Sequence, residues 1–148
     1  MINIRPTEYK DIPAIAYLEE VIFSSPWSEE SLNRFLGYDY ARFFTAFEDD
    51  TVIGYIGSYK AGDELDIINV AVDEKYRGRG IGRSLVEKVL EAAGADGCPA
   101  VNLEVRESND TAKRLYENLG FVNLGIRKNF YSKPTENANI YRYDFDMK

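Results

Sequence analysis

A short segment rich in glycine and arginine joins a predicted strand to a predicted helix, and this connection constrains the fold more than any other part of the chain. Residues 76–84 read Tyr-Arg-Gly-Arg-Gly-Ile-Gly-Arg-Ser, follow the apolar run 65–72 and lead into a helical pattern that begins at Ile81. Glycines at alternate positions leave backbone N–H groups unshielded, so an anion can approach the peptide itself. The amides and dipole of the helix N-terminus add to that attraction. The sequence therefore predicts a phosphate-binding turn between a strand and a helix.

The charge of this segment contrasts with that of the whole chain. Lys75, Arg77, Arg79 and Arg83 place four positive charges within nine residues of a chain whose formal net charge is −7. An acidic protein is a poor match for nucleic acid, because contacts to phosphate backbones need a basic face. The acidic balance would suit a cationic substrate, and it also fits an ordinary soluble surface. We therefore expect the positive segment to bind a phosphate-bearing ligand and expect no nucleic-acid partner.

The hydrophobic patterns predict a single domain over residues 1–148, a length sufficient to bury a core. Alternating or continuous apolar runs indicate strands over residues 2–5, 43–48, 52–60, 64–72, 100–105, 121–131 and 139–147. Helical spacing and capping residues indicate a helix over 7–20 capped by Thr7, a short helix after Ser28, a helix over 81–93, and one that follows Asn109 and ends at Gly120. The expected fold class is α/β, with a mixed sheet flanked by helices.

The composition argues against several other classes of protein. No stretch approaches the roughly 18 apolar residues of a transmembrane helix, and the N-terminus alternates like a strand instead of resembling a signal peptide. With one cysteine, Cys98, and no histidine, the chain cannot form an intrachain disulfide and is predicted to hold no metal. Cys98 also lacks a histidine to activate it, so we expect no catalytic role for it. These features predict a soluble, cytoplasmic protein without a membrane partner.

Three phosphate-binding patterns compete for the glycine segment. The P-loop pattern requires lysine after its second glycine, but Gly82 is followed by Arg83. The dinucleotide fingerprint requires glycine at its sixth position, where Arg83 stands, although Glu104 supplies an acidic residue 24 positions after Gly80. The dinucleotide pattern therefore stays open as an alternative, and the P-loop pattern does not.

Arg77, Gly80 and Gly82 match the third pattern, an arginine with glycines three and five positions later. This pattern resembles the segment that holds the pyrophosphate of coenzyme A in the GNAT N-acetyltransferase superfamily. Other segments are similar to one branch of it, the RimI-like ribosomal-protein alanine N-acetyltransferases, in order along essentially the whole chain: residues 26–29, 69–73, 103–106, 108–109, 115–121 and 126–131. The resemblance implies a mostly antiparallel seven-stranded sheet flanked by about four helices.

The resemblance also implies that acetyl-coenzyme A is the co-substrate. Backbone amides of residues 78–83 would bind its pyrophosphate, and the nearby arginines suit its additional phosphate. The pantetheine arm would pair with the strand through residues 70–72, where a backbone N–H, that of Val70, would stabilise negative charge on the thioester oxygen. The implied cofactor-binding residues are Val70, Ala71, Val72, Arg77, Gly78, Arg79, Gly80, Ile81, Gly82, Arg83, Ser84, Asn109 and Tyr116.

Glu104 is the candidate general base. An α-amino group has a pKa of about 8, so roughly a tenth of it is neutral at pH 7 and a carboxylate can remove its proton directly or through water. Strand alternation places Glu104 on the face opposite Leu103 and Val105. The alternative is an ordinary glutamate at a strand end, paired with Arg106 or Arg127. The resemblance favours the catalytic role.

Tyr116 is the candidate general acid that would return a proton to the leaving thiolate. It follows Asn109 by seven residues, two helical turns, so both side chains can face one groove. The alternative for Tyr116 is a core tyrosine on an apolar stripe, and Asn109 could cap its helix, bind the coenzyme, or do both. Trp27 and Tyr131 are candidates for lining the peptide entrance, although both have packing alternatives.

The resemblance predicts direct acetyl transfer, through a tetrahedral intermediate, to the N-terminal amine of a protein, with alanine of a ribosomal protein as the expected acceptor. Two alternatives remain, a GNAT enzyme for a lysine side chain or a small-molecule amine, and a non-catalytic coenzyme A binding module. A pure binder would have no use for the base and the acid. Residues 136–141 depart from the family's usual acidic pair and apolar run, so the peptide specificity is left open, as is the oligomeric state.

Overall fold

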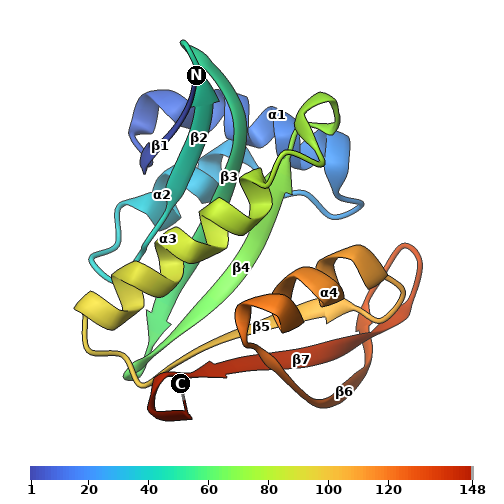
Figure 1. Ribbon diagram of the computed structural model, residues 1–148. Coiled ribbons are helices and arrows are strands. Elements are labelled where there is room, and N and C mark those ends of the chain that lie inside the picture. The colour runs from blue at the N-terminus through green and yellow to red at the C-terminus, as the bar shows by residue number, and fades with distance from the viewer. Residues whose placement is uncertain (148) are drawn as a thin grey trace.

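Seven strands form one sheet in the computed structural model, which describes residues 1–147 (Figure 1). Lys148, the last residue of the predicted domain, lies outside this range. All neighbouring strands are antiparallel except β4 and β5, which are parallel, and the order is β1-β2-β3-β4-β5-β7-β6. The strands are β1 (Ile2–Pro6), β2 (Phe44–Glu48), β3 (Thr51–Ala61), β4 (Glu64–Val72), β5 (Ala100–Arg106), β6 (Val122–Tyr131) and β7 (Glu136–Asp144). This confirms the predicted mixed, mostly antiparallel sheet.

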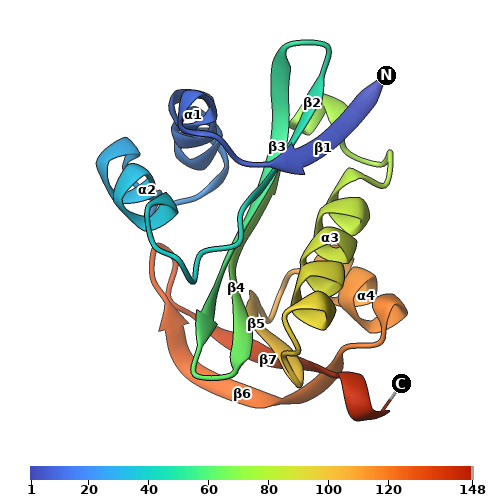
Figure 2. The ribbon, with the colours of Figure 1, turned by 90° about the vertical axis from the view of Figure 1, so that its left-hand side faces the viewer.

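Helices cover both faces of the sheet. Figure 2 shows α1 (Ile12–Ile22) and α2 (Glu29–Leu36) on one face, and α3 (Ile81–Ala95) and α4 (Asp110–Leu119) on the other. Three short 3₁₀ turns are η1 (Tyr9–Asp11), η2 (Glu74–Tyr76) and η3 (Phe145–Met147), and η3 occupies the end of the segment predicted as the last strand. Each face has its own buried apolar cluster, with Leu85 and Val89 on one side and Ile12, Ile15 and Leu32 on the other. No helix within residues 1–147 is long and apolar enough to cross a membrane.

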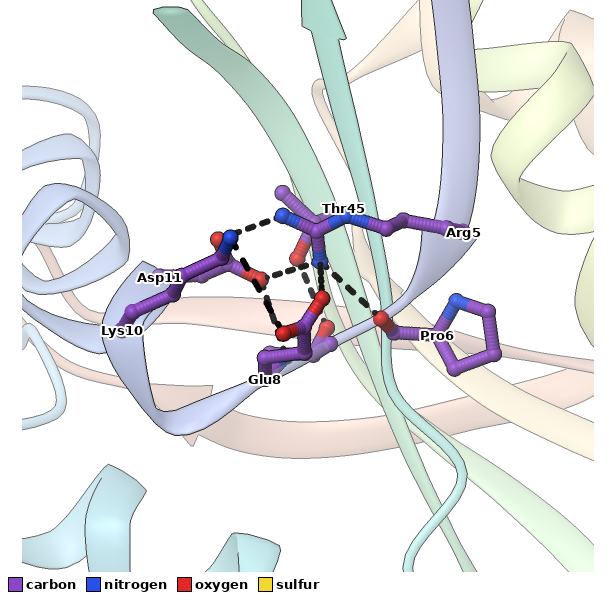
Figure 3. A network of polar contacts seen from close by, with 7 residues as sticks. Arg5, Pro6, Glu8, Lys10, Asp11 and Thr45 are labelled. Atoms are coloured by element: carbon purple, nitrogen blue, oxygen red, sulfur yellow. Dashed lines mark hydrogen bonds and ion pairs between the residues drawn. The ribbon is translucent and has the colours of Figure 1, made fainter. Parts of the chain in front are cut away.

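Local capping signals place the N-termini of α2 and α4. The Ser28 side chain accepts a hydrogen bond from the Ser31 amide at 3.1 Å, and Asn109 caps α4 through the Ala112 amide at 3.2 Å. The predicted cap at Thr7 is wrong, because the Thr7 hydroxyl contacts the hydroxyl of Thr45 at 2.7 Å. The chain instead enters η1 and then α1 through a capping box formed by Glu8 and Asp11 (Figure 3).

Asp11 is 4% exposed and forms a bidentate pair with Arg5, at 2.6 Å to Nη1 and 2.9 Å to Nη2 (Figure 3). Burial alone would raise the pKa of Asp11, but the hydrogen bonds from Arg5 and from the Glu8 amide outweigh it, so the pKa lies below its usual value. A charged acceptor held in this way contributes substantially to stability, because its loss removes charge-assisted hydrogen bonds at a buried position.

We expect Asp11→Asn to lower the free energy of unfolding at pH 7 by about 2 kcal/mol. Because the pKa of Asp11 is lowered on folding, this contribution is present above the unfolded pKa of about 4 and is lost as the pH falls through the lower folded pKa. Urea unfolding of both proteins at pH 7 and pH 3 measures the difference. A difference between the two proteins that stayed constant between these pH values would contradict the ionic role of Asp11.

The strands β4 and β5 diverge soon after they meet. They pair at Leu65 with Val101 and at Asp66 with Asn102, and no later register is formed within the described chain. At the paired end of the two strands, Asn102 and Arg142 both donate hydrogen bonds to Glu64. Arg142 contacts both carboxylate oxygens, at 2.8 and 2.9 Å. Figure 1 shows the two strands separating toward α4. The divergence leaves the outer half of β4 paired with β3 alone.

Candidate active site

A cleft of about 950 Å³ lies where β4 and β5 separate. Its walls come from both strands, from α4, from the loop between α1 and α2, and from the connection between β6 and β7. Six residues singled out from the sequence line it together, namely Trp27, Val70, Glu104, Asn109, Tyr116 and Tyr131. The fold thus brings the candidate base, the candidate acid and both entrance candidates to one cleft.

Glu104 lies on β5 between two core residues. Leu103 and Val105 are buried, whereas the Glu104 side chain is 32% exposed and lines the cleft, as strand alternation predicts. Arg127 on β6 donates a hydrogen bond from Nη1 to Glu104 Oε1 at 3.1 Å. Within residues 1–147, no donor contacts the other oxygen of Glu104. Glu104 therefore both lines the cleft and pairs with Arg127. Arg127 orients the carboxylate through Oε1, and the second oxygen can accept a proton.

Tyr116 is 7% exposed and packs its ring against Phe121 and Tyr141, with centroids 5.7 and 6.2 Å away. Tyr116 is part of the hydrophobic core, as expected for a core tyrosine, and it also lines the cleft. No hydrogen-bond partner of its hydroxyl lies within the described residues. Burial, assisted by the nearby Tyr131, raises the pKa of Tyr116 well above its ordinary value. The hydroxyl is therefore protonated at neutral pH and can act as a donor.

The glycine segment begins shortly after β4 ends. Gly78 and Gly80 have φ values of 81° and 77°, the left-handed region that favours glycine, and a Cβ at either would meet open space. At Gly82, a Cβ would make ordinary van der Waals contacts with Leu115 and Val72, so glycine leaves slightly more space between these side chains and the backbone. Within the described chain, the amides of residues 78–83 have no acceptor. These six amides are available to an anion.

The arginines of this segment already contact neighbouring groups. Arg77 Nε donates to the Val72 carbonyl at 3.2 Å, and the Arg79 guanidinium lies 5.0 Å from the centre of the Tyr76 ring. Arg83 Nε lies 3.5 Å from a carboxylate oxygen of Glu87, one turn along α3. Each arginine would have to share or exchange such a contact to reach a phosphate. The helix also uses the Ser84 amide, which donates to the Gly80 carbonyl at 3.0 Å, so only the Ser84 hydroxyl remains for a ligand.

On β4, residues 70–72 have one backbone edge that pairs with β3 and one that does not pair with β5. Ala71 is buried in the cluster beneath α1 and α2, whereas Val70 and Val72 pack against the cluster beneath α3 and α4. Their pairing partners on β3 are Ile56, Tyr55 and Gly54, so one backbone edge is used. The other edge faces the space left by β5, because β5 has already diverged.

Trp27, in the loop between α1 and α2, and Tyr131, at the end of β6, line opposite walls of the cleft. Trp27 stands edge-on to Phe35 at 5.5 Å, and its backbone amide donates to Glu19 at 2.9 Å. Across the cleft, the Arg106 guanidinium lies 4.5 Å from the centre of the Tyr131 ring. Burial and the Glu104 carboxylate raise the pKa of Tyr131 to about 12. The packing alternatives for both aromatic residues therefore hold alongside their positions at the cleft.

The model of the acetyltransferase (GNAT) family matches residues 12–121. The chain belongs to the GNAT family. A putative ribosomal protein bS18-alanine N-acetyltransferase of Bacillus subtilis is 33% identical over 138 residues, covering 93% of this chain and 91% of that protein. The bS18-alanine N-acetyltransferase of Escherichia coli is 34% identical over 131 residues, 88% of each chain. Its crystal structure superposes with a TM-score of 0.89, covering 97% of this chain and 94% of that one.

An uncharacterized protein of Mycobacterium leprae is 36% identical over 137 residues, 88% of this chain and 37% of that longer protein. Family membership and these relatives identify the chain as a RimI-like N-acetyltransferase. The same findings confirm the GNAT fold expected from the resemblance, with its seven-stranded sheet.

Two residues of this GNAT site escaped the interpretation of the sequence. Glu19 is fully buried beside the cleft wall, and Arg106, considered only as a partner of Glu104, instead pairs with Glu136 at 3.2 Å and donates to the carbonyls of Ser132 and Pro134. Helical spacing offered one signal for Glu19, because it lies on the same face as Ile15. No local pattern indicates the partners of Arg106, which lie 25 and more residues away.

Proposed function

We propose that the protein is a cytoplasmic, single-domain, acetyl-CoA-dependent Nα-acetyltransferase that acts on the N-terminal alanine of a ribosomal protein. One observation carries the proposal, namely that Glu104 and Tyr116 line one cleft beside the free edge of β4. The acceptor is inferred from the names of the relatives in Bacillus subtilis and Escherichia coli.

The chain's own groups fit acetyl-CoA. The amides of residues 78–83, at the start of α3, suit a diphosphate, and the left-handed Gly78 and Gly80 keep side chains away from it. The free edge of β4 offers hydrogen-bonding groups to an extended, amide-containing arm. When bound, the coenzyme supplies an acetyl thioester, and a backbone N–H of β4, that of Val70, would stabilise negative charge on its oxygen.

The two side chains divide the proton transfers. Glu104 accepts a proton from the acceptor ammonium, with Arg127 holding its Oε1 in place. The task is modest, since an α-amine has a pKa of about 8. Tyr116 keeps its proton at neutral pH, because burial raises its pKa, and donates it to the departing sulfur. No acyl-enzyme is required, so the buried Cys98 takes no part.

Mass spectrometry of two matched peptides tests the proposal. One begins with a free alanine amine and has its lysine blocked, and the other has a blocked N-terminus and a free lysine. We expect the first peptide to gain one acetyl group and the second to remain unchanged. Preference for the second would identify a side-chain acetyltransferase. Binding of acetyl-CoA without turnover of either peptide or of small amines would identify a non-catalytic module.

A further inference from the structure

Glu19 is a charged residue in the interior that the proposed chemistry does not use. It lies on α1 with 0% exposure, and none of the described residues forms a salt bridge with it. Its carboxylate accepts hydrogen bonds from the Tyr55 hydroxyl, from the Trp27 amide at 2.9 Å and from Asn69 Nδ2 at 2.9 Å. A buried carboxylate without a counter-charge is costly, so these three donors determine where it can reside.

The three donors come from three segments that meet at the cleft. Tyr55 lies on β3, Asn69 lies on β4 immediately before Val70, and Trp27 belongs to the loop between α1 and α2. Asn69 and Trp27 both line the cleft. Near Asn69, Ile68 is an extra residue in the pairing of β4 with β3, so the local backbone departs from a regular ladder. Through these hydrogen bonds, Glu19 links Trp27 in the cleft wall to the irregular part of β4.

A purely structural role would not require a carboxylate at this position. Burying an ionised group seldom stabilises a fold more than well-packed apolar side chains do. The buried Asp11 provides the comparison, because it is paired with Arg5 and none of the residues in that network lines the cleft (Figure 3). Both carboxylates are buried, but Asp11 binds Arg5 outside the cleft, whereas Glu19 binds two residues that line it.

We propose that Glu19 is a positioning residue for the acceptor. Its carboxylate fixes the position of Trp27, in the cleft wall, relative to Asn69 on β4. The inference rests on the proposed N-acetyltransferase function. It predicts that removing the carboxylate loosens the acceptor side of the cleft and leaves the glycine segment, on the far side of β4, unchanged. Peptide binding should therefore suffer more than coenzyme binding.

Steady-state kinetics with an alanine-starting peptide tests this separation. We expect Glu19→Ala to raise the peptide KM about tenfold and to lower kcat severalfold, with the acetyl-CoA KM unchanged within about twofold. Glu19→Gln should recover most of the loss, because its amide oxygen can accept from Trp27 while its amide N–H groups donate to Tyr55 and to a flipped Asn69. Glu19→Asp keeps the charge but is too short for all three contacts, so its peptide KM should fall between those of the other two variants.

Asp11→Asn is the matched control, expected to lose stability with no change in peptide KM. Trp27 is the single tryptophan of the chain, so its fluorescence reports on the wall without any turnover. Glu19→Ala and Glu19→Asp should shift the emission to longer wavelength, whereas Glu19→Gln and Asp11→Asn should not. Unchanged KM and emission in folded Glu19→Asp would overturn the inference. If the wild-type protein acetylates no peptide, the proposed function fails, while the fluorescence still decides whether Glu19 holds the wall.

Discussion

We expect replacement of Glu104 with glutamine to lower kcat at pH 7 by about a hundredfold or more, the usual contribution of a general base. The substitution preserves the shape of the side chain and removes its ability to take a proton. Affinity for acetyl-CoA should stay the same, because Glu104 lies on β5, away from the glycine segment at the start of α3. Turnover of an alanine-starting peptide and calorimetric titration with acetyl-CoA measure the two quantities. Glu91→Gln, on the exposed side of α3, serves as the control with unchanged kcat.

The pH dependence separates a base from a merely orienting residue. The acceptor α-amine loses its own proton above its pKa of about 8, so the need for a base diminishes there. The deficit of Glu104→Gln should therefore shrink between pH 7 and pH 9.5. A deficit that stays constant across this range would mean that Glu104 orients the acceptor and does not remove its proton.

We expect Tyr116→Phe to give the second large effect, a reduction of kcat by about a hundredfold, because the proposed proton donor for the leaving thiolate would be lost. The ring still packs on Phe121 and Tyr141, so the free energy of unfolding changes by less than about 0.5 kcal/mol. Since burial raises the pKa of Tyr116, the wild-type hydroxyl keeps its proton up to at least pH 9 and causes no alkaline loss of activity below that pH.

Tyr141→Phe provides a matched control for this result. The Tyr141 hydroxyl donates to Glu117 at 2.7 Å and does not line the cleft. Its removal should lower the free energy of unfolding by about 1 kcal/mol and leave kcat unchanged. Thermal unfolding of both variants measures the change in stability, and initial rates measure kcat. Equal kcat in Tyr116→Phe and the wild type would assign Tyr116 to the core alone.

Features that depend on neighbours in the sequence could be predicted. The alternation around Glu104 placed it on the cleft side of β5, and the caps at Ser28 and Asn109 act through amides three residues ahead. The positive φ values of Gly78 and Gly80 follow from the glycine pattern. Thr7 was misassigned because its hydroxyl contacts the distant Thr45, which no local pattern records, and the local capping box is formed by Glu8 and Asp11 instead.

The site residues that escaped prediction depend on long-range contacts. The donors to Glu19 lie 8, 36 and 50 residues away along the chain, so a helical glutamate gives no sign of its burial. The divergence of β4 and β5 is equally hidden, because both strands have ordinary apolar patterns. The proposed roles of Glu104 and Tyr116 came from the resemblance to the GNAT family and stay predictions until the variants are measured.

The divergence of β4 from β5 also bears on self-association. A strand with unpaired backbone groups commonly recruits a strand from another molecule, which leads to aggregation. Here the unpaired part of β4 lies inside a cleft, between β5 on one side and β3 on the other. A slender extended ligand should fit this space more easily than the sheet edge of a second molecule, because β3 and β5 flank it. We therefore expect the unpaired edge of β4 to be a poor site for pairing with a second copy of the chain.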